Sequence, residues 1–220
     1  MKFMKRSEEE KYYNLLGNLR HINNESVVLD LGANIGDVTS YLYEKFMPSI
    51  YSYEPNIICY DHMIKRFKNF SKIKIHNFAV SDFTGKSYLY FHANSRGIND
   101  YNYIQGATLR PEKDDIDIRK KIEIKCIDIK TVLKSFTKID LIKIDVEGSE
   151  YSIMPEIIKN KNKIKMVICE THGNPNGKKV FNSNRTKKVM KNSAFEKDHK
   201  HLVNQLKQMK LYGSWFHEWY

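Results

Sequence analysis

The stretch Val27–Lys45, "VVLDLGANIGDVTSYLYEK", decides the fold class of the chain. It begins with an apolar run that contains Asp30, passes through the turn sequence "GANIG" at 32–36, and continues with residues spaced as in a helix. A buried strand, a glycine turn and a helix in this order are typical of the ligand-binding edge of a parallel α/β sheet. The stretch therefore predicts a nucleotide-type binding site at this turn.

The glycine pattern of the turn excludes two common phosphate-binding sites. A dinucleotide fold requires G-x-G-x-x-G, because the middle glycine lets a pyrophosphate approach the backbone. Here Asn34 stands in the place of that glycine, between Gly32 and Gly36, and no G-K-[ST] follows as in a P-loop. We therefore expect a ligand without phosphate at this turn. S-adenosylmethionine has an adenosine and an amino-acid tail but no phosphate, so it fits.

Strands and helices alternate along the chain, which favours a parallel α/β sheet. Two runs, 85–92 and 120–129, instead alternate apolar and polar residues, as half-exposed antiparallel strands do. We predict a Rossmann-like, mostly parallel sheet flanked by helices, with a β-hairpin insert. The parallel strands are expected within 26–32, 50–55, 72–82, 139–150 and 163–172, and the helices at 7–23, 36–47, 56–69, 128–136 and 149–159.

An acidic side chain stands at the end of each expected parallel strand. In open α/β sheets the ligand binds outside the carboxyl ends of the strands, so acids at this edge indicate a polar cleft that binds hydroxyl groups. The five acids are Asp30, Glu54, Asp82, Asp145 and Glu170.

Three strand ends are placed to hold S-adenosylmethionine. Asp30 can meet the ammonium of the methionine part, directly or through water. Glu54 follows about 20 residues later, where an acid can accept both ribose hydroxyls. Ser81 and Asp82, at the end of the expected third strand, are placed to reach the adenine amine. The product of methyl transfer from this cofactor is S-adenosylhomocysteine.

Six short motifs resemble the FkbM-type S-adenosylmethionine-dependent methyltransferases, in this order along the chain: "LDLGANIG", "YEP", "AVSDFTG", "GATL", "IDLIKIDVEGSE" and "ICETH". The resemblance covers roughly residues 25–172. It implies the class I methyltransferase fold with a seven-stranded-type sheet, and O-methylation, often of a sugar hydroxyl. With the neighbours in the same turns, the expected cofactor-binding residues are Asp30, Gly32, Ala33, Asn34, Gly36, Glu54, Pro55, Ser81, Asp82 and Asp145.

The candidate catalytic residues lie in "LIKIDVEG" and at the end of the next strand. Strand alternation places Lys143, Asp145 and Glu147 on one face. A lysine inside a central strand is costly unless paired, and Asp145 is its expected partner. These residues are either a catalytic base and acceptor-orienting set or a structural ion pair below the cleft. His172 is a further candidate base, because imidazole titrates near neutral pH, and a strand-end surface histidine is the alternative.

A metal site is the weaker interpretation of these side chains. Asp145, Glu147, Glu170 and His172 offer oxygen and imidazole ligands for a divalent cation. Their spacing is not a recognised metal pattern, so we predict none.

The insert and the segment 173–200 are the candidate acceptor-binding parts. Tyr101 and Tyr103 can stack on a sugar ring or a base, and Arg96 and Arg110 can steer an anionic acceptor; exposed surface positions are the alternative for all four. The segment 173–200 is basic and rich in glycine, proline and asparagine, and the resemblance does not extend to it. It is either a substrate-facing lid or a surface loop.

The length of 220 residues suits one domain. We expect a single methyltransferase domain over 1–220. Its parts are an N-terminal helix at 1–24, the cofactor-binding core at 25–172, the basic loop or lid at 173–200, and a C-terminal helix and strand at 201–220.

Three separated cysteines without a CxxC pair predict buried, reduced thiols and hence a cytoplasmic location. The first residues carry no apolar signal core, and no apolar run approaches the roughly 20 residues of a membrane span. We therefore expect no membrane span.

The net charge of +11 favours anionic partners, although abundant lysine, asparagine and isoleucine are also typical of an AT-rich genome. The first hypothesis is O-methylation of a saccharide or a related small molecule. The alternative is an RNA methyltransferase that acts on a cap or a ribose 2′-hydroxyl through the basic surface. A third is a protein that binds S-adenosylmethionine without catalysis.

Overall fold

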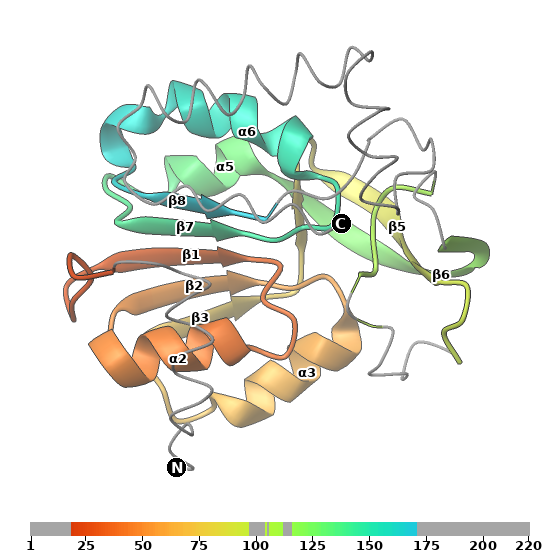
Figure 1. The fold of residues 1–220 in the computed structure, drawn as a ribbon, viewed down its shortest axis with the longest axis horizontal. Helices are drawn as coiled ribbons and strands as arrows, with labels where there is room; N and C mark the ends of the chain where they lie inside the picture. Colours follow the sequence, from red (N-terminus) through yellow and green to blue (C-terminus); the bar gives the residue numbers. More distant parts are fainter. Residues whose placement is uncertain (1–18, 97–103, 105, 112–115, 171–220) are drawn as a thin grey trace, which may run out of the picture.

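Five parallel strands form the first sheet, in the order β3-β2-β1-β7-β8 (Figure 1). Its central strand β1 (Val27–Leu31) pairs with β2 (Ser49–Tyr53) on one side and with β7 (Leu141–Ile144) on the other. The outer strands are β3 (Ile73–His76) and β8 (Val167–Cys169). The strand order reverses between β1 and β7, which is where open α/β sheets bind their ligands.

The computed structural model describes residues 19–96, 104, 106–111 and 116–170. The expected parts at 173–200 and 201–220 lie outside these residues, as does most of the expected N-terminal helix.

Helices cover both faces of the first sheet, as a parallel sheet requires. The helices α2 (Asp37–Phe46) and α3 (Ile57–Arg66) contribute to the apolar clusters on one face. The helices α5 (Ile129–Lys134) and α6 (Glu150–Lys159) cover the other face. The predicted Rossmann-like α/β fold is confirmed.

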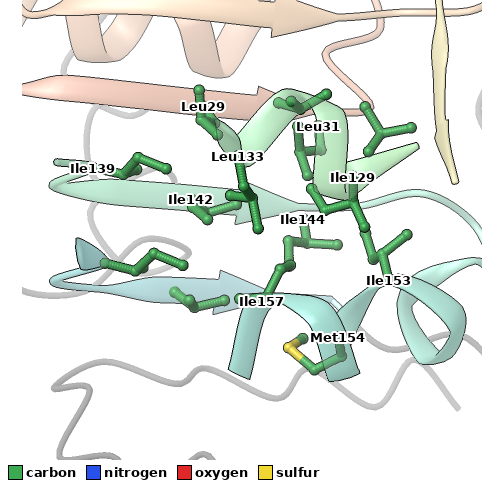
Figure 2. Packing of buried hydrophobic residues seen from close by; sticks show 14 of the residues in the cluster. Leu29, Leu31, Ile129, Leu133, Ile139, Ile142, Ile144, Ile153, Met154 and Ile157 are labelled. Carbon is green, nitrogen blue, oxygen red and sulfur yellow. The ribbon is translucent and has the colours of Figure 1, made fainter. Parts of the chain in front are cut away.

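The largest apolar cluster lies between the sheet and the helices α5 and α6 (Figure 2). Leu31 from β1 and Ile144 from β7 point from the sheet toward Leu133 and Ile153 of these helices. Fully burying such a side chain stabilises the fold by about 1.5–3 kcal/mol. Because strand residues alternate between faces, Asp30 and Lys143 point toward α2 instead.

A second sheet contains β4 (Ala79–Ser81), β6 (Ile116–Asp128) and β5 (Gly85–His92), in this order. The strands β5 and β6 are antiparallel, with a register shift between Tyr90 and Phe91. This pair confirms the predicted hairpin insert. Figure 1 shows it beyond the arrowheads of β1 and β7, at the edge formed by the carboxyl ends of these strands.

One expected strand is wrong in its extent. The run 72–82 was expected as a single strand, but it forms β3 in the first sheet and β4 in the second. Asn77 and Phe78 separate the two, and the Asn77 side chain donates hydrogen bonds to the carbonyls of Glu54 and Pro55. Asp82 therefore follows a strand of the second sheet, and β3 ends at His76.

The three cysteines Cys59, Cys126 and Cys169 are buried and free, as predicted. Within the described ranges, no helix combines the length and the apolar character that a membrane crossing needs.

Candidate functional site

The turn after β1 is built on the end of β2. The backbone N–H groups of Gly32 and Ala33 both donate to the carbonyl of Tyr53, at 3.0 Å each. Gly32 has φ 78°, and a Cβ atom there would lie 1.8 Å from the backbone oxygen of Asp145. Only glycine fits this approach, so the β1 and β7 ends meet because residue 32 has no side chain.

The second half of this turn rests on α3. Gly36 has φ 84°, and a Cβ atom there would lie 2.6 Å from the ring of Phe67. Arg66 donates to the carbonyl of Ile35 at 3.0 Å and pairs with Asp37 at the start of α2. Asn34 also has a left-handed backbone, with φ 51°, a conformation that asparagine tolerates better than most residues. The turn is therefore fixed before any ligand binds.

Glu54 is a buried acid of the site with a raised pKa. It lies just after β2 and is 7% exposed. Its Oε2 accepts from the N–H of Asn34, and its Oε1 accepts from the N–H of Asn56, both at 2.8 Å. Burial raises the pKa of Glu54 to about 7, and the two N–H donors and the more distant Lys143 offset only part of this rise. A carboxylate has further lone pairs, so additional donors can stabilise its charged form.

Asn56 stands beside Glu54 and caps α3 through its Oδ1, which accepts from the N–H of Ile58 at 3.0 Å. The buried Nδ2 of Asn56 has no hydrogen-bond partner among the described residues. The acid beside it has a raised pKa and fits a ligand that donates hydrogen bonds, as a ribose diol does.

A buried polar network lies under the turn. Lys143 donates to the carbonyl of Gly32 at 2.8 Å, and its Nζ lies 3.3 Å from Asp30 Oδ1 and 3.4 Å from Asp145 Oδ2. The other oxygen of Asp30 accepts from the hydroxyl of Thr39 in α2 at 2.7 Å. The expected ion pair of Lys143 and Asp145 is present, and Asp30 is a second partner.

This network bears on two of the expected roles, those of Lys143 and Asp30. Burial alone would lower the pKa of Lys143, but the carboxylates of Asp30 and Asp145 outweigh it and raise the pKa. Lys143 therefore keeps its proton at neutral pH, which excludes it as a catalytic base. Asp30 is 0% exposed and turns toward Lys143 and Thr39, so in this structure its carboxylate is not open to a direct contact with a ligand ammonium.

The turn after β7 is held by the insert. Glu147 has φ 52° and is followed by Gly148 with φ 109°. The hydroxyl of Thr108 donates to the carbonyl of Glu147, and Arg110 donates to the carbonyl of Gly148 at 3.4 Å. Thr108 is itself fixed by two backbone hydrogen bonds with Tyr90 of β5. The second sheet thus sets the shape of the turn that carries the candidate acids.

The other expected site residues are only partly brought together. Glu170 follows β8 and donates its N–H to Ile144, so it shares an edge with Asp145. Ser81 is buried and donates to the exposed Asp82 at 3.1 Å. His172, Tyr101 and Tyr103, all candidate ligand-facing residues, lie outside the described residues. Pro55 lies between Glu54 and Asn56, and Arg96 lies beyond the end of β5.

No group of three or more potential metal ligands occurs among the residues that the structure describes. The metal prediction concerns His172 as well, so it stays a prediction.

Three residues of the site have no obvious signal in the sequence. Thr39 and Ser52 extend the network from Asp30, and Thr108 holds Glu147 across a separation of 39 residues. The contact between a small hydroxyl side chain and a buried acid can be recognised only once the strand register is known. For Thr108, the motif "GATL" identifies the segment but does not predict the hydrogen bond to Glu147.

The fold and the site define a class: the chain is a Rossmann-like α/β protein whose β1 turn suits a nucleoside without phosphates. Residues 30–210 match the methyltransferase FkbM domain, which is more than half of the chain. The chain therefore belongs to the FkbM methyltransferase family. It is an S-adenosylmethionine-dependent methyltransferase, so the predicted family and cofactor are confirmed.

Several solved structures are similar to the chain at low sequence identity. Aeropyrum pernix fibrillarin, with natively bound S-adenosyl-L-methionine, is 8% identical with a TM-score of 0.42; the match covers 93% of this chain and 70% of that one. Precorrin-6y C5,15-methyltransferase from Geobacter metallireducens GS-15 is 11% identical with a TM-score of 0.41, over 90% and 73% of the two chains.

A third similar structure is P. horikoshii TYW2 in complex with MeSAdo, which is 10% identical with a TM-score of 0.28. The match covers 35% of this chain and spans only 29% of the TYW2 chain. No curated protein matches the chain.

Proposed function

We propose that the chain transfers the methyl group of S-adenosylmethionine to a hydroxyl of a saccharide or a related small molecule. The observation that carries this proposal is the acidic edge beside the β1 turn, where Asp145 is half-buried and Glu147 follows in a turn fixed by Thr108. Carboxylates bind hydroxyl groups and accept their protons, so this edge suits an alcohol as acceptor.

The donor supplies an electrophilic methyl on its sulfonium. The residues of the chain hold and orient this donor: Glu54 accepts hydrogen bonds from the ribose hydroxyls, and the backbone of the 32–36 turn supports the nucleoside. Pro55, Ser81 and Asp82 remain proposed contacts on the adenosine side. Alignment of donor and acceptor supplies much of the rate in such a displacement.

A proton leaves the acceptor hydroxyl when the new bond forms. Asp145 and Glu147 are the candidate groups to accept or orient this proton among the described residues, and His172 remains a third candidate. Lys143 is excluded as the base because it is already protonated.

We propose a reducing, cytoplasmic compartment for the reaction, which the three free cysteines support.

The experiment is methyl transfer from tritiated S-adenosylmethionine to two acceptor panels, soluble saccharides and capped RNA. We expect label in a saccharide. The substitution Glu147→Gln should lower transfer at least tenfold with unchanged S-adenosylhomocysteine binding. Glu123→Gln is the matched control, because Glu123 is an exposed acid of β6 that pairs with Lys86 at the surface. Label in RNA alone would contradict the proposed acceptor and favour the alternative.

A further inference from the structure

The central strands β1 and β7 place two opposite charges side by side. Asp30 and Lys143 are register partners in the parallel pair, so their side chains leave the sheet on the same face, under α2. Ser52 of β2 lies in the same row, and its hydroxyl is 2.8 Å from that of Thr39. This polar row crosses the middle of an otherwise apolar sheet.

The ammonium of Lys143 contacts groups from three different segments. It reaches the carbonyl of Gly32 in the β1 turn, the carboxylate of Asp30 inside β1, and the carboxylate of Asp145 after β7. The contact with Gly32 is a hydrogen bond, whereas the contact with Asp30 is an ion pair in which Asp30 Oδ1 accepts no hydrogen bond. Lys143 is buried, with its side chain 9% exposed, and it ties the two strand ends together.

The two acids of this cluster differ in their access to the edge of the sheet. The side chain of Asp30 is 0% exposed, whereas that of Asp145 is 30% exposed. Of the two carboxylates in this cluster, Asp145 is the one with exposed surface. A ligand cation that arrives at this edge therefore meets Asp145, in an orientation set by Lys143.

We propose that Lys143 is a positioning residue of the donor site, which neutralises Asp30 and holds Asp145 and the Gly32 turn in place for the amino-acid part of S-adenosylmethionine. This proposal rests on the donor site described above and not on the identity of the acceptor. It divides the donor site into two parts. Glu54 binds the ribose, and the cluster of Lys143, Asp30 and Asp145 binds the charged amino-acid tail.

A pair of nucleosides tests this separation. S-adenosylhomocysteine carries the amino-acid tail, and 5′-methylthioadenosine has the same adenosine and sulfur without it. In calorimetric titrations, Lys143→Met should weaken S-adenosylhomocysteine binding at least tenfold and change 5′-methylthioadenosine binding less than threefold. Methionine keeps a similar length without charge, so the cluster loses its cation and its three contacts.

The matched control is Glu54→Gln, which should weaken both nucleosides by similar factors because both carry the ribose. A second variant, Asp145→Asn, covers the case in which Lys143→Met does not fold. Its partly exposed side chain tolerates an isosteric change, and it too should weaken S-adenosylhomocysteine selectively.

Equal losses for both nucleosides in Lys143→Met, or an unchanged or tighter affinity for S-adenosylhomocysteine, would overturn the role of Lys143. Failure of Asp145→Asn to discriminate between the nucleosides would overturn it as well. If the wild-type protein binds neither nucleoside, the donor site fails together with this proposal. A wrong acceptor class leaves all of these titrations unchanged.

Discussion

The turns after β1 and β7 lie at the same edge of the sheet, but different parts of the molecule hold them. The β1 turn is fixed by the first sheet and its helices, through the carbonyl of Tyr53, the carboxylate of Glu54 and the side chain of Arg66. The β7 turn is fixed by the insert, through Thr108 and Arg110. The β1 turn therefore depends on contacts within the first sheet and its helices, whereas the turn that carries Glu147 depends on contacts with the insert.

The first prediction tests the close contact between the β1 turn and the β7 turn at Gly32. Gly32→Ala places a Cβ atom on the backbone oxygen of Asp145, so we expect a loss of about 4 kcal/mol or more in unfolding free energy. For a domain of this size, this corresponds to a melting temperature lower by roughly 8–16 °C.

The matched control is Gly106→Ala. Gly106 also has a left-handed backbone, with φ 86°, but its nearest neighbour to a Cβ atom is 3.9 Å away. Backbone strain alone should cost about 1–2 kcal/mol there. Equal destabilisation by both substitutions in thermal unfolding would contradict the close approach at Gly32.

The second prediction concerns the charge of Glu54, which contacts the β1 turn. Glu54→Gln should weaken S-adenosylhomocysteine binding about 100-fold, because charge-assisted hydrogen bonds to two ribose hydroxyls are lost, at about 1.5–3 kcal/mol each, partly replaced by the amide. An amide also cannot accept from both Asn34 and Asn56. Calorimetry measures the affinity, and a change of less than threefold would remove Glu54 from the site.

The third prediction is a pH dependence of the same binding step. The pKa of Glu54 is raised to about 7 by burial, so below pH 7 the free protein carries a neutral Glu54. If the ribose binds the carboxylate, affinity for S-adenosylhomocysteine should fall by up to tenfold per pH unit as the pH drops from 7 to 5.5, and level off above pH 8. Protons should be released on binding at pH 6.5. A flat profile, identical to that of Glu54→Gln, would contradict this.

The smallest expected effect lies on the β7 side. Thr108→Val keeps the shape of the side chain but removes the hydroxyl that joins Glu147 and Arg110. We expect a loss of about 1–2 kcal/mol in unfolding free energy and less than a threefold change in S-adenosylhomocysteine affinity. Thr108→Ser should restore the stability. A large loss of donor affinity would mean that the Glu147 part of this turn also serves the donor.

The strands and helices were largely predictable because their periodicity is local. The run "VVLDLG" and the glycines at 32 and 36 identify the β1 turn, and the 85–92 alternation identifies the hairpin. The split of 72–82 into β3 and β4 was not predictable, because the whole run resembles one strand and the break depends on Asn77, which contacts the residues after β2.

The site was predictable in its residue types but not in the roles of its charges. Asp30 and Lys143 are visible in the sequence, yet their relation depends on the register of two strands that are more than one hundred residues apart. Asp30 is enclosed inside β1, whereas Asp145 follows the end of β7 and is partly exposed. The acidic residues in the sequence predict a polar cleft, but their positions within the cleft follow only from the fold.

The central claim is that the donor nucleoside lies at the end of β1 and β2 with its ribose on Glu54. A crystal structure of the protein with S-adenosylhomocysteine tests it most directly. We predict both ribose hydroxyls within hydrogen-bond distance of the Glu54 carboxylate and the ligand ammonium beside Asp145. A nucleoside bound elsewhere, or with its ribose turned away from Glu54, would contradict the claim.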